Sequence, residues 1–414
     1  MENPATDRKP SEARTERPGL CRVISLCGAV LLFLTAVPVM TYTQVLSQSK
    51  TPSAEPIPEP AVAAILAAFD KYEVVAMPEA HGNKDIDDFI FSLIRNPTFS
   101  DKVNDIEVEC GNSLYQPALD HYIAGEDISF TEVRKVWRNT TQAMCGMSGF
   151  FEQFFSLVRA INQKLPPAKR LRVLAGDPPI DWEQVKSFQD TLKFVDRDAS
   201  IASVMAKEVL SKHRKALMLF GTHHLMHGEE GNAVSSYEKN YPGLTFVISD
   251  LGYFDTNAPT LSGSRFVNWP VPSLARAKGT WLGALELSNF LPPGIMIDKD
   301  CKAHTDFPKP LQGPSEHLID AFLYLGPQDL RLVEQRPADI ALDVDYRMEV
   351  WRRESLPGSP WPPPPGTLKE ANQQIIAGAE HPIFVIPKMQ PTPQMIKDIE
   401  QSCLDSKSHS SPPQ

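Results

Sequence analysis

The sequence lacks several features that identify common classes of protein. It has no excess of positive charge, because 41 Lys and Arg face 51 Asp and Glu and the formal net charge is −10. Proteins that bind nucleic acid carry a basic footprint for the phosphates, so this balance argues against a nucleic-acid partner. It also has no glycine-rich phosphate loop of the P-loop or Rossmann type, and no internal repeat of the kind that builds solenoids or propellers.

Cysteine is scarce, with six residues in a chain of 414 and no Cys-x-x-Cys pair. Beyond residue 40 the cysteines are Cys110, Cys145, Cys301 and Cys403, and their spacings are too wide to resemble a zinc site. An exported compartment would permit disulfides between them, but the sequence does not reveal which cysteines pair. The hydrophobic share of 42% and the charged share of 22% are those of a globular protein. The length is enough for one large domain or two ordinary ones.

The N-terminal region differs in composition from the rest. Residues 1–22 are polar and basic, and residues 23–40 carry no charge over a length that is about sufficient to cross a bilayer. The basic flank predicts that residues 1–22 lie in the cytoplasm and the bulk of the chain outside it, in the periplasm or extracellular space. No clean small-x-small cleavage site stands out, which favours a retained single-pass membrane helix or signal anchor over a cleaved signal peptide. Residues 41–60 are expected to form a flexible linker and residues 404–414 a disordered tail.

Residues 61–403 alternate predicted helices with predicted strands. The strands are short apolar runs bounded by turn signals, and helical periodicity follows most of them. The predicted strands are residues 74–77, 105–109, 171–175, 216–220, 244–249, 321–325 and 383–386. This alternation predicts an α/β fold with a largely parallel central sheet flanked by helices.

Ionisable residues follow the ends of four successive predicted strands. They are Glu79 with His81, then Glu109, then Asp177, then His224. Each could also have a purely structural role, as an ion-pair partner, a turn cap or a surface histidine. In open α/β sheets, however, ligands bind outside the carboxyl ends of the strands, and those ends meet at one edge. We therefore expect these residues to share one polar site, with Asp177 at its rim.

Short motifs accompany these positions in a fixed order. They are Pro-Glu-Ala-His-Gly at 78–82 with Asp85, Val-Glu-Cys-Gly at 108–111, Tyr-Ile-Ala-Gly at 122–125, Leu-Ala-Gly-Asp at 174–177, Arg-Asp at 197–198, Phe-Gly-Thr-His-His at 220–224 and Asp-Ala-Phe-Leu-Tyr-Leu at 320–325. Together they resemble the motifs of the erythromycin esterase-like proteins. The single residue between Glu79 and His81 is more similar to the ChaN and TIKI-type proteins of the same superfamily.

The resemblance implies two kinds of chemistry. Erythromycin esterases hydrolyse a lactone with a water activated by His and Glu and need no metal, whereas TIKI-like relatives bind a divalent metal for proteolysis and ChaN binds haem iron. The residues themselves allow both, because a neutral His81 can accept a proton from water, and His81, His224 and Glu79 can also ligate a metal.

We favour hydrolysis of an ester or related bond in a small-molecule substrate, without a required cofactor. In this interpretation His81 is the base, Glu79 and Glu109 orient it, and His224 is a second acid/base or oxyanion partner. A neutral His81 base predicts that activity falls below about pH 6–7. The alternatives are a metal- or haem-binding protein without catalysis, and an inactive scaffold. Substrate specificity is expected from the irregular segments 257–314 and 356–366.

Overall fold

The computed structural model describes residues 54–79, 81–252, 263–290, 296–297, 300–304, 313–359, 364, 366–382, 384–385 and 392–409. The chain divides into two units, Met1–Lys50 and Thr51–Gln414, and all described residues belong to the second unit. The expected basic tail, the expected membrane helix and most of the expected linker lie outside the described residues. Within the part that is described, no helix combines the length and the apolar character needed to cross a membrane.

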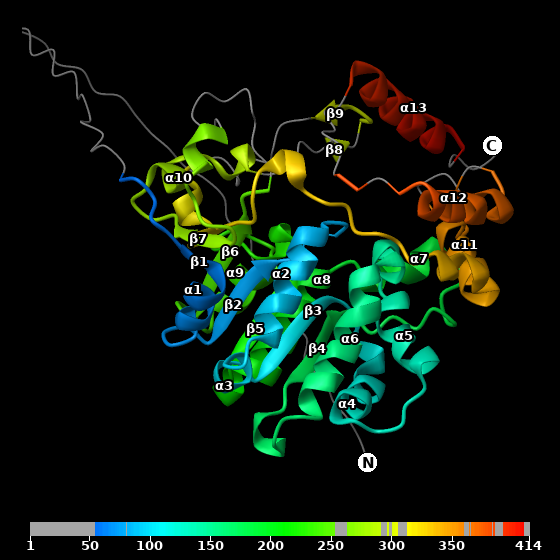
Figure 1. The fold of residues 1–414 in the computed structure, drawn as a ribbon. Helices are drawn as coiled ribbons and strands as arrows, with labels where there is room; N and C mark the ends of the chain where they lie inside the picture. Colours follow the sequence, from blue (N-terminus) through cyan, green and yellow to red (C-terminus); the bar gives the residue numbers. More distant parts are fainter. Residues whose placement is uncertain are drawn as a thin grey trace, which may run out of the picture. The chain divides into compact units, whose positions relative to one another are not determined.

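The centre of the described unit is an eight-stranded sheet with the order β1-β7-β10-β6-β2-β5-β3-β4 (Figure 1). Its strands are β1 Pro58–Pro60, β2 Val74–Pro78, β3 Asp105–Asn112, β4 Arg172–Asp177, β5 Ala216–Phe220, β6 Thr245–Asp250, β7 Ser273–Arg276 and β10 Ala321–Tyr324. A separate antiparallel pair is formed by β8 Met296–Ile297 and β9 Ala303–His304.

The sheet is mixed. Most of its strand pairings are parallel, as expected, but two are antiparallel. The six strands from β10 to β4 run parallel to their neighbours, whereas β7 pairs antiparallel with both β10 and β1. Strand β1 consists of Pro58, Glu59 and Pro60, and proline is tolerated in a sheet at an edge because no ladder hydrogen bond is needed on the outer side. Ala54 also forms a bridge with Thr280. Regular structure therefore begins before residue 60, where the flexible linker was expected to end.

Helices cover both faces of the sheet. They are α1 Ala61–Ala68, α2 Lys84–Arg95, α3 Phe99–Lys102, α4 Gln116–Ala124, α5 Phe130–Arg138, α6 Gly149–Asn162, α7 Phe188–Thr191, α8 Arg197–Val204, α9 Ala233–Glu238, α10 Trp281–Ala284, α11 Val344–Glu354, α12 Leu368–Glu380 and α13 Pro393–His409. Helices α1, α2, α4, α5 and α6 pack on one face, and α8, α9 and α10 pack on the other. Successive residues of β2 divide between the two cores, with Val75 in the first and Val74 in the second, as strand geometry requires.

Two disulfides join distant parts of the chain. Cys110 at the end of β3 is bonded to Cys145, and Cys301 beside β9 is bonded to Cys403 in α13. The disordered tail expected over residues 404–414 is wrong at its start, because α13 continues to His409.

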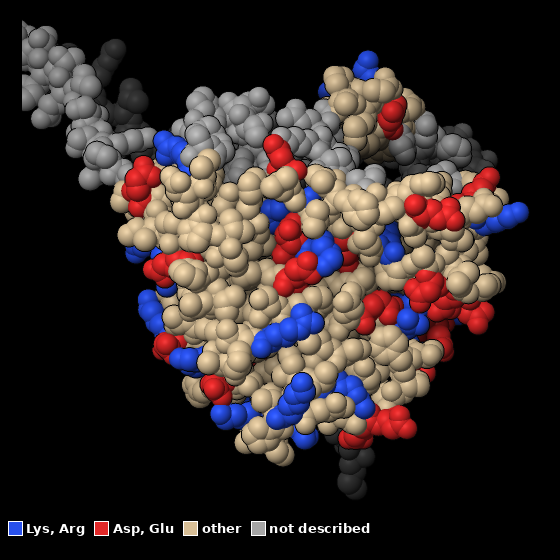
Figure 2. All heavy atoms as spheres, in the orientation of Figure 1, with Lys and Arg blue, Asp and Glu red and all other residues tan. Residues whose placement is uncertain are grey.

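Charged side chains of both signs are interspersed over the coloured part of the face drawn in Figure 2. Exposed ion pairs on the surface include Lys84 with Asp88 and Lys169 with Asp101. Pairs of this kind add little to stability because water screens them. The fold is therefore held mainly by the two apolar cores.

Candidate functional site

The loop that carries His81 is held between β2 and α2. Glu79, which is only 1% exposed, continues from β2 and its N–H donates to the Phe220 carbonyl over 3.0 Å. Gly82 has a φ of +84°, a left-handed conformation that favours glycine, and it turns the chain toward α2. The Asn83 side chain then caps α2 by accepting hydrogen bonds from the N–H groups of Asp85 and Ile86.

A second segment, which contains Leu332 and Glu334, is hydrogen-bonded to this loop. The Lys84 N–H donates to the Leu332 carbonyl over 3.0 Å, and the Glu334 N–H donates to the Gly82 carbonyl over 2.9 Å. Glu334 in turn accepts hydrogen bonds from the Ser148 hydroxyl and the Phe150 N–H at the start of α6. The position of His81 is thus fixed by backbone contacts on both sides of its loop.

Four of the residues expected at the site lie together at the carboxyl edge of the sheet. His81 Nδ1 is 2.7 Å from Glu79 Oε2, and His81 Nε2 is 3.6 Å from Glu109 Oε2. His224 Nε2 lies 3.6 Å from the other oxygen, Glu109 Oε1. Glu109 Oε2 also accepts the Gly221 N–H over 2.7 Å. The Glu109 carboxylate therefore stands between two imidazoles.

Arg197 and Asp198, the first residues of α8, complete this cluster. The Arg197 guanidinium donates from Nη2 to Glu109 Oε1 and from Nε to Asp177 Oδ1, both over 2.9 Å. Asp198 Oδ1 lies 2.8 Å from His224 Nδ1. This Arg-Asp pair is one of the motifs found in the sequence, but neither residue was expected at the site. The signal was available, because several carboxylates brought to one sheet edge require a cation to offset their charge.

Asp177 was expected at the rim of the site, but it does not lie there. Its side chain is fully buried and accepts hydrogen bonds from the Thr141 N–H over 2.6 Å and the Thr141 hydroxyl over 2.7 Å, in addition to Arg197. Bonds to both oxygens offset the cost of burying a carboxylate, so Asp177 positions Arg197 and faces no solvent. His223 precedes His224 in a single turn of 3₁₀ helix, Thr222–His224, rather than in an extended strand.

The charges in the cluster set its protonation. Burial acts against ionisation of Glu109, but hydrogen bonds with His224 and His81 outweigh it and hold the pKa of this carboxyl well below its usual value. Burial likewise opposes protonation of both histidines. Glu79 and Glu109 nevertheless raise the pKa of His81 to about 11, and Asp198 and Glu109 raise the pKa of His224 to about 9. These shifts favour the protonated form of both imidazoles at neutral pH, whereas the base role expected for His81 requires its neutral form.

The donor atoms do not fit a metal centre of three protein ligands. Among the described residues, one group of three potential ligands lies within 4.8 Å of one another, and it consists of Glu79, His81 and Cys110. The Cys110 sulfur is bonded to Cys145 and is not available as a thiolate, whereas catalytic zinc sites use three protein ligands. Haem iron fits no better, because each ring nitrogen of His81 and of His224 faces a carboxylate within 3.6 Å.

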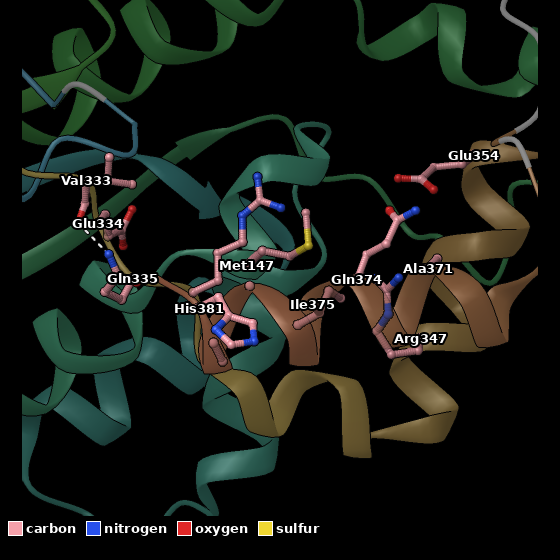
Figure 3. Close-up of a pocket in the computed structure, with 13 residues that line it drawn as sticks. Met147, Val333, Glu334, Gln335, Arg347, Glu354, Ala371, Gln374, Ile375 and His381 are labelled. Carbon is pink, nitrogen blue, oxygen red and sulfur yellow. Dashed lines mark hydrogen bonds between the residues drawn. The ribbon is translucent and has the colours of Figure 1, made fainter. Parts of the chain in front are cut away.

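A cavity of about 450 Å³ lies beside the segment that fastens the His81 loop. Its lining includes Val333, Glu334, Arg347, Gln374 and His381, contributed by that segment and by α11, α12 and the residue that follows α12 (Figure 3). None of the expected site residues lines it. It is therefore separate from the Glu109 cluster.

No protein-family profile matches the sequence, and no curated protein matches it. Three solved structures are similar in backbone arrangement. The type III effector HopBA1 has 15% identity and a TM-score of 0.31 over 48% of this chain and 88% of its own. A Bacillus cereus protein has 9% identity and a TM-score of 0.44 over 69% of this chain and 97% of its own. ChaN of Campylobacter jejuni, solved with cofacially bound haem, has 14% identity and a TM-score of 0.28 over 45% of this chain and 84% of its own. Membership of the erythromycin esterase-like superfamily stays a prediction from the motifs.

Proposed function

We propose that the chain is a hydrolase that cleaves an ester or a related bond of a small molecule. The observation that carries this proposal is the position of the Glu109 carboxylate between the imidazoles of His81 and His224, at 3.6 Å from each. A carboxylate can orient a water and accept its proton, and an imidazolium can donate one to a leaving group. Glu109 and a neighbouring imidazolium together supply the base and the acid of the reaction at one edge of the sheet.

The proposed cycle moves one proton around the cluster. Glu109 accepts a proton from water as the oxygen of that water attacks the carbonyl carbon of the substrate. The Nε2–H of His81 donates its proton to the departing alkoxide, so that the ester becomes a carboxylic acid and an alcohol. Glu109 then returns its proton to His81 Nε2, 3.6 Å away. In this cycle His81 is the acid, whereas the sequence led us to expect it as the base.

The other residues position these two groups. Glu79 faces His81 Nδ1 at 2.7 Å and directs Nε2 toward Glu109. Arg197 holds the opposite oxygen of Glu109 and is itself held by Asp177. His224, fixed by Asp198 at 2.8 Å, supplies a second positive charge that stabilises an oxyanion.

We also propose that this domain is exported and held at a membrane by residues 23–40. The support is the uncharged stretch and its basic flank in the sequence. The lipid bilayer is then a partner of residues 23–40 alone, and the Glu109 cluster acts outside the cytoplasm.

Hydrolysis is tested with a panel of alkyl esters, whose alkoxide leaving groups require a proton, by titration of the released acid in wild type and in the variants His81→Gln and Glu109→Gln. Removing either the acid or the base is expected to lower kcat by about 10² to 10⁴. His317→Gln is the matched control, because His317 is exposed and should leave kcat unchanged. Circular dichroism establishes that each variant is folded. Full activity in a folded His81→Gln or Glu109→Gln protein would refute the proposed mechanism.

A further inference from the structure

A large cavity adjoins the Glu109 cluster through Arg197. Its volume is about 710 Å³, and Thr141 and Arg197, which both bond Asp177, line it. Sites for small molecules in proteins typically measure about 300 to 1,000 Å³. The cavity is therefore large enough for a ligand of that class, and one of its residues touches Glu109.

Much of the lining of this cavity is apolar and aromatic. Ile180, Trp182, Phe188, Phe194 and Leu356 contribute to it. Ile180 and Leu356 belong to a small buried core of their own, against which Trp182 and Phe194 pack. These side chains are held in place by that core, so the apolar lining is preformed.

The cationic residues of the lining already have partners. The Arg197 guanidinium binds Glu109 and Asp177. Arg353 pairs with Glu349 at 2.8 Å, donates to the Arg138 carbonyl over 3.0 Å, and lies 4.6 Å from the centre of the Trp182 ring. Among the lining residues that the structure describes, the one acid is Glu354, and burial raises its pKa. The cavity thus offers no uncompensated positive charge to an anionic ligand.

Apolar side chains are also exposed next to the cavity. Val195, which lines it, is 67% exposed, and Leu192 in the same segment is 38% exposed. Exposed apolar side chains that border an apolar cavity mark sites of ligand contact more often than isolated ones do. The segment 356–366, from which we expected substrate specificity, supplies Leu356, Ser359 and Pro364 to the lining.

We propose that this cavity binds the neutral apolar part, an acyl chain or an aromatic ring, of the molecule whose bond is cleaved at the Glu109 cluster. The inference rests on the proposed hydrolase function for the identity of that bond, but not for the binding itself. An apolar group in the cavity places the adjoining ester beyond Arg197, on the side of Glu109. Substrates with an anionic group at that position are excluded, because both arginines of the cavity are already paired with carboxylates.

Binding is tested on the full chain in lipid nanodiscs by calorimetry, with empty nanodiscs as the blank. The probes are 2-naphthamide and 2-naphthoate, which share one ring system and differ in charge. We expect 2-naphthamide to bind and 2-naphthoate to bind at least about tenfold more weakly. Val195→Asp places a charge at the cavity and should weaken 2-naphthamide binding at least about tenfold. Val267→Asp is the matched control, since Val267 is 74% exposed and does not line the cavity.

Ester hydrolysis supplies the second measurement. The Val195→Asp variant should lose at least about tenfold in kcat/KM for 4-nitrophenyl hexanoate and little for 4-nitrophenyl acetate. Binding that is lost in Val195→Asp alone supports the cavity even if no ester is cleaved, and then the hydrolase proposal fails by itself. Equal binding of both probes, or equal effects of the two Asp variants, would overturn the cavity proposal. Ester hydrolysis without a preference for chain length would also contradict the cavity proposal and would leave the hydrolase proposal standing.

Discussion

The clearest test of the electrostatics concerns His227, which lies outside the proposed site. Its Nε2 is 2.9 Å from Asp320 Oδ2 and its Nδ1 is 3.0 Å from Glu238 Oε2. This arrangement joins α9 to the residue that precedes β10. Replacing His227 with Gln keeps a polar side chain of similar size and removes the charge that both carboxylates face. The variant therefore isolates the contribution of one imidazolium to folding.

The structure gives the magnitude and the sign of this contribution. Burial opposes protonation of His227, but Asp320 and Glu238 outweigh it and raise the pKa from 6.5 to about 9. A shift of this size corresponds to roughly 3 kcal/mol. The folded pKa lies above the unfolded value, so the stabilisation is fully present below pH 6.5 and is lost as the pH rises through about 9.

Urea unfolding of the full chain at pH 6 and at pH 9.5 measures this difference. At pH 6 the His227→Gln variant should be less stable than wild type by up to roughly 3 kcal/mol, and the deficit should largely vanish at pH 9.5. The exposed control His317→Gln should match wild type at both pH values. A His227→Gln deficit of the same size at both pH values would show that packing, and not the charge, is lost.

Further predictions follow from other contacts. Because His81 and His224 donate or stabilise as cations, ester hydrolysis should persist down to pH 5 and decline above about pH 9, and a profile that instead falls between pH 7 and 5 would restore the neutral-base mechanism. Arg197→Gln leaves the buried Asp177 carboxylate without the cation it faces and should lower the free energy of unfolding by about 3–5 kcal/mol, whereas unchanged urea midpoints would contradict the ion-pair geometry. Cys145→Ser removes one disulfide and should cost about 2–4 kcal/mol in the same assay, and an unchanged stability under oxidising conditions would show that the bond does not form. A reporter fused after residue 53 should be active only outside the cytoplasm, and cytoplasmic activity would rule out the proposed topology.

The central strands could be predicted from the sequence because each is a short apolar run. Strands β2 and β5 are buried along their whole length, so their residues show the continuous hydrophobicity of a parallel sheet covered on both faces. The two strands at the antiparallel end of the sheet, β1 and β7, could not be found in this way. Strand β1 contains two prolines and β7 has four residues, and neither pattern stands out from a loop until its pairing partner is known.

Convergence of the site residues also followed from the sequence, since parallel strands bring their carboxyl ends to one edge. Protonation did not, because it depends on distances of a few ångströms. Glu79 and Glu109 face the two nitrogens of His81, and only that geometry reveals an acid where the residue type indicated a base. The burial of Asp177 was missed for a similar reason, since its partner Thr141 is remote in sequence.

The residues of the Glu109 cluster and those of the adjoining cavity occupy different parts of the chain. The cluster is built where strands β2, β3, β4 and β5 end and where α8 begins, whereas most of the cavity comes from segments 180–195 and 353–364. The residues of those segments that the structure describes belong to no strand of the sheet. Mutation can therefore alter which molecule is accepted without unpairing a strand or moving Glu109. A lineage of such proteins can diversify in ligand preference while the same reaction centre is inherited unchanged.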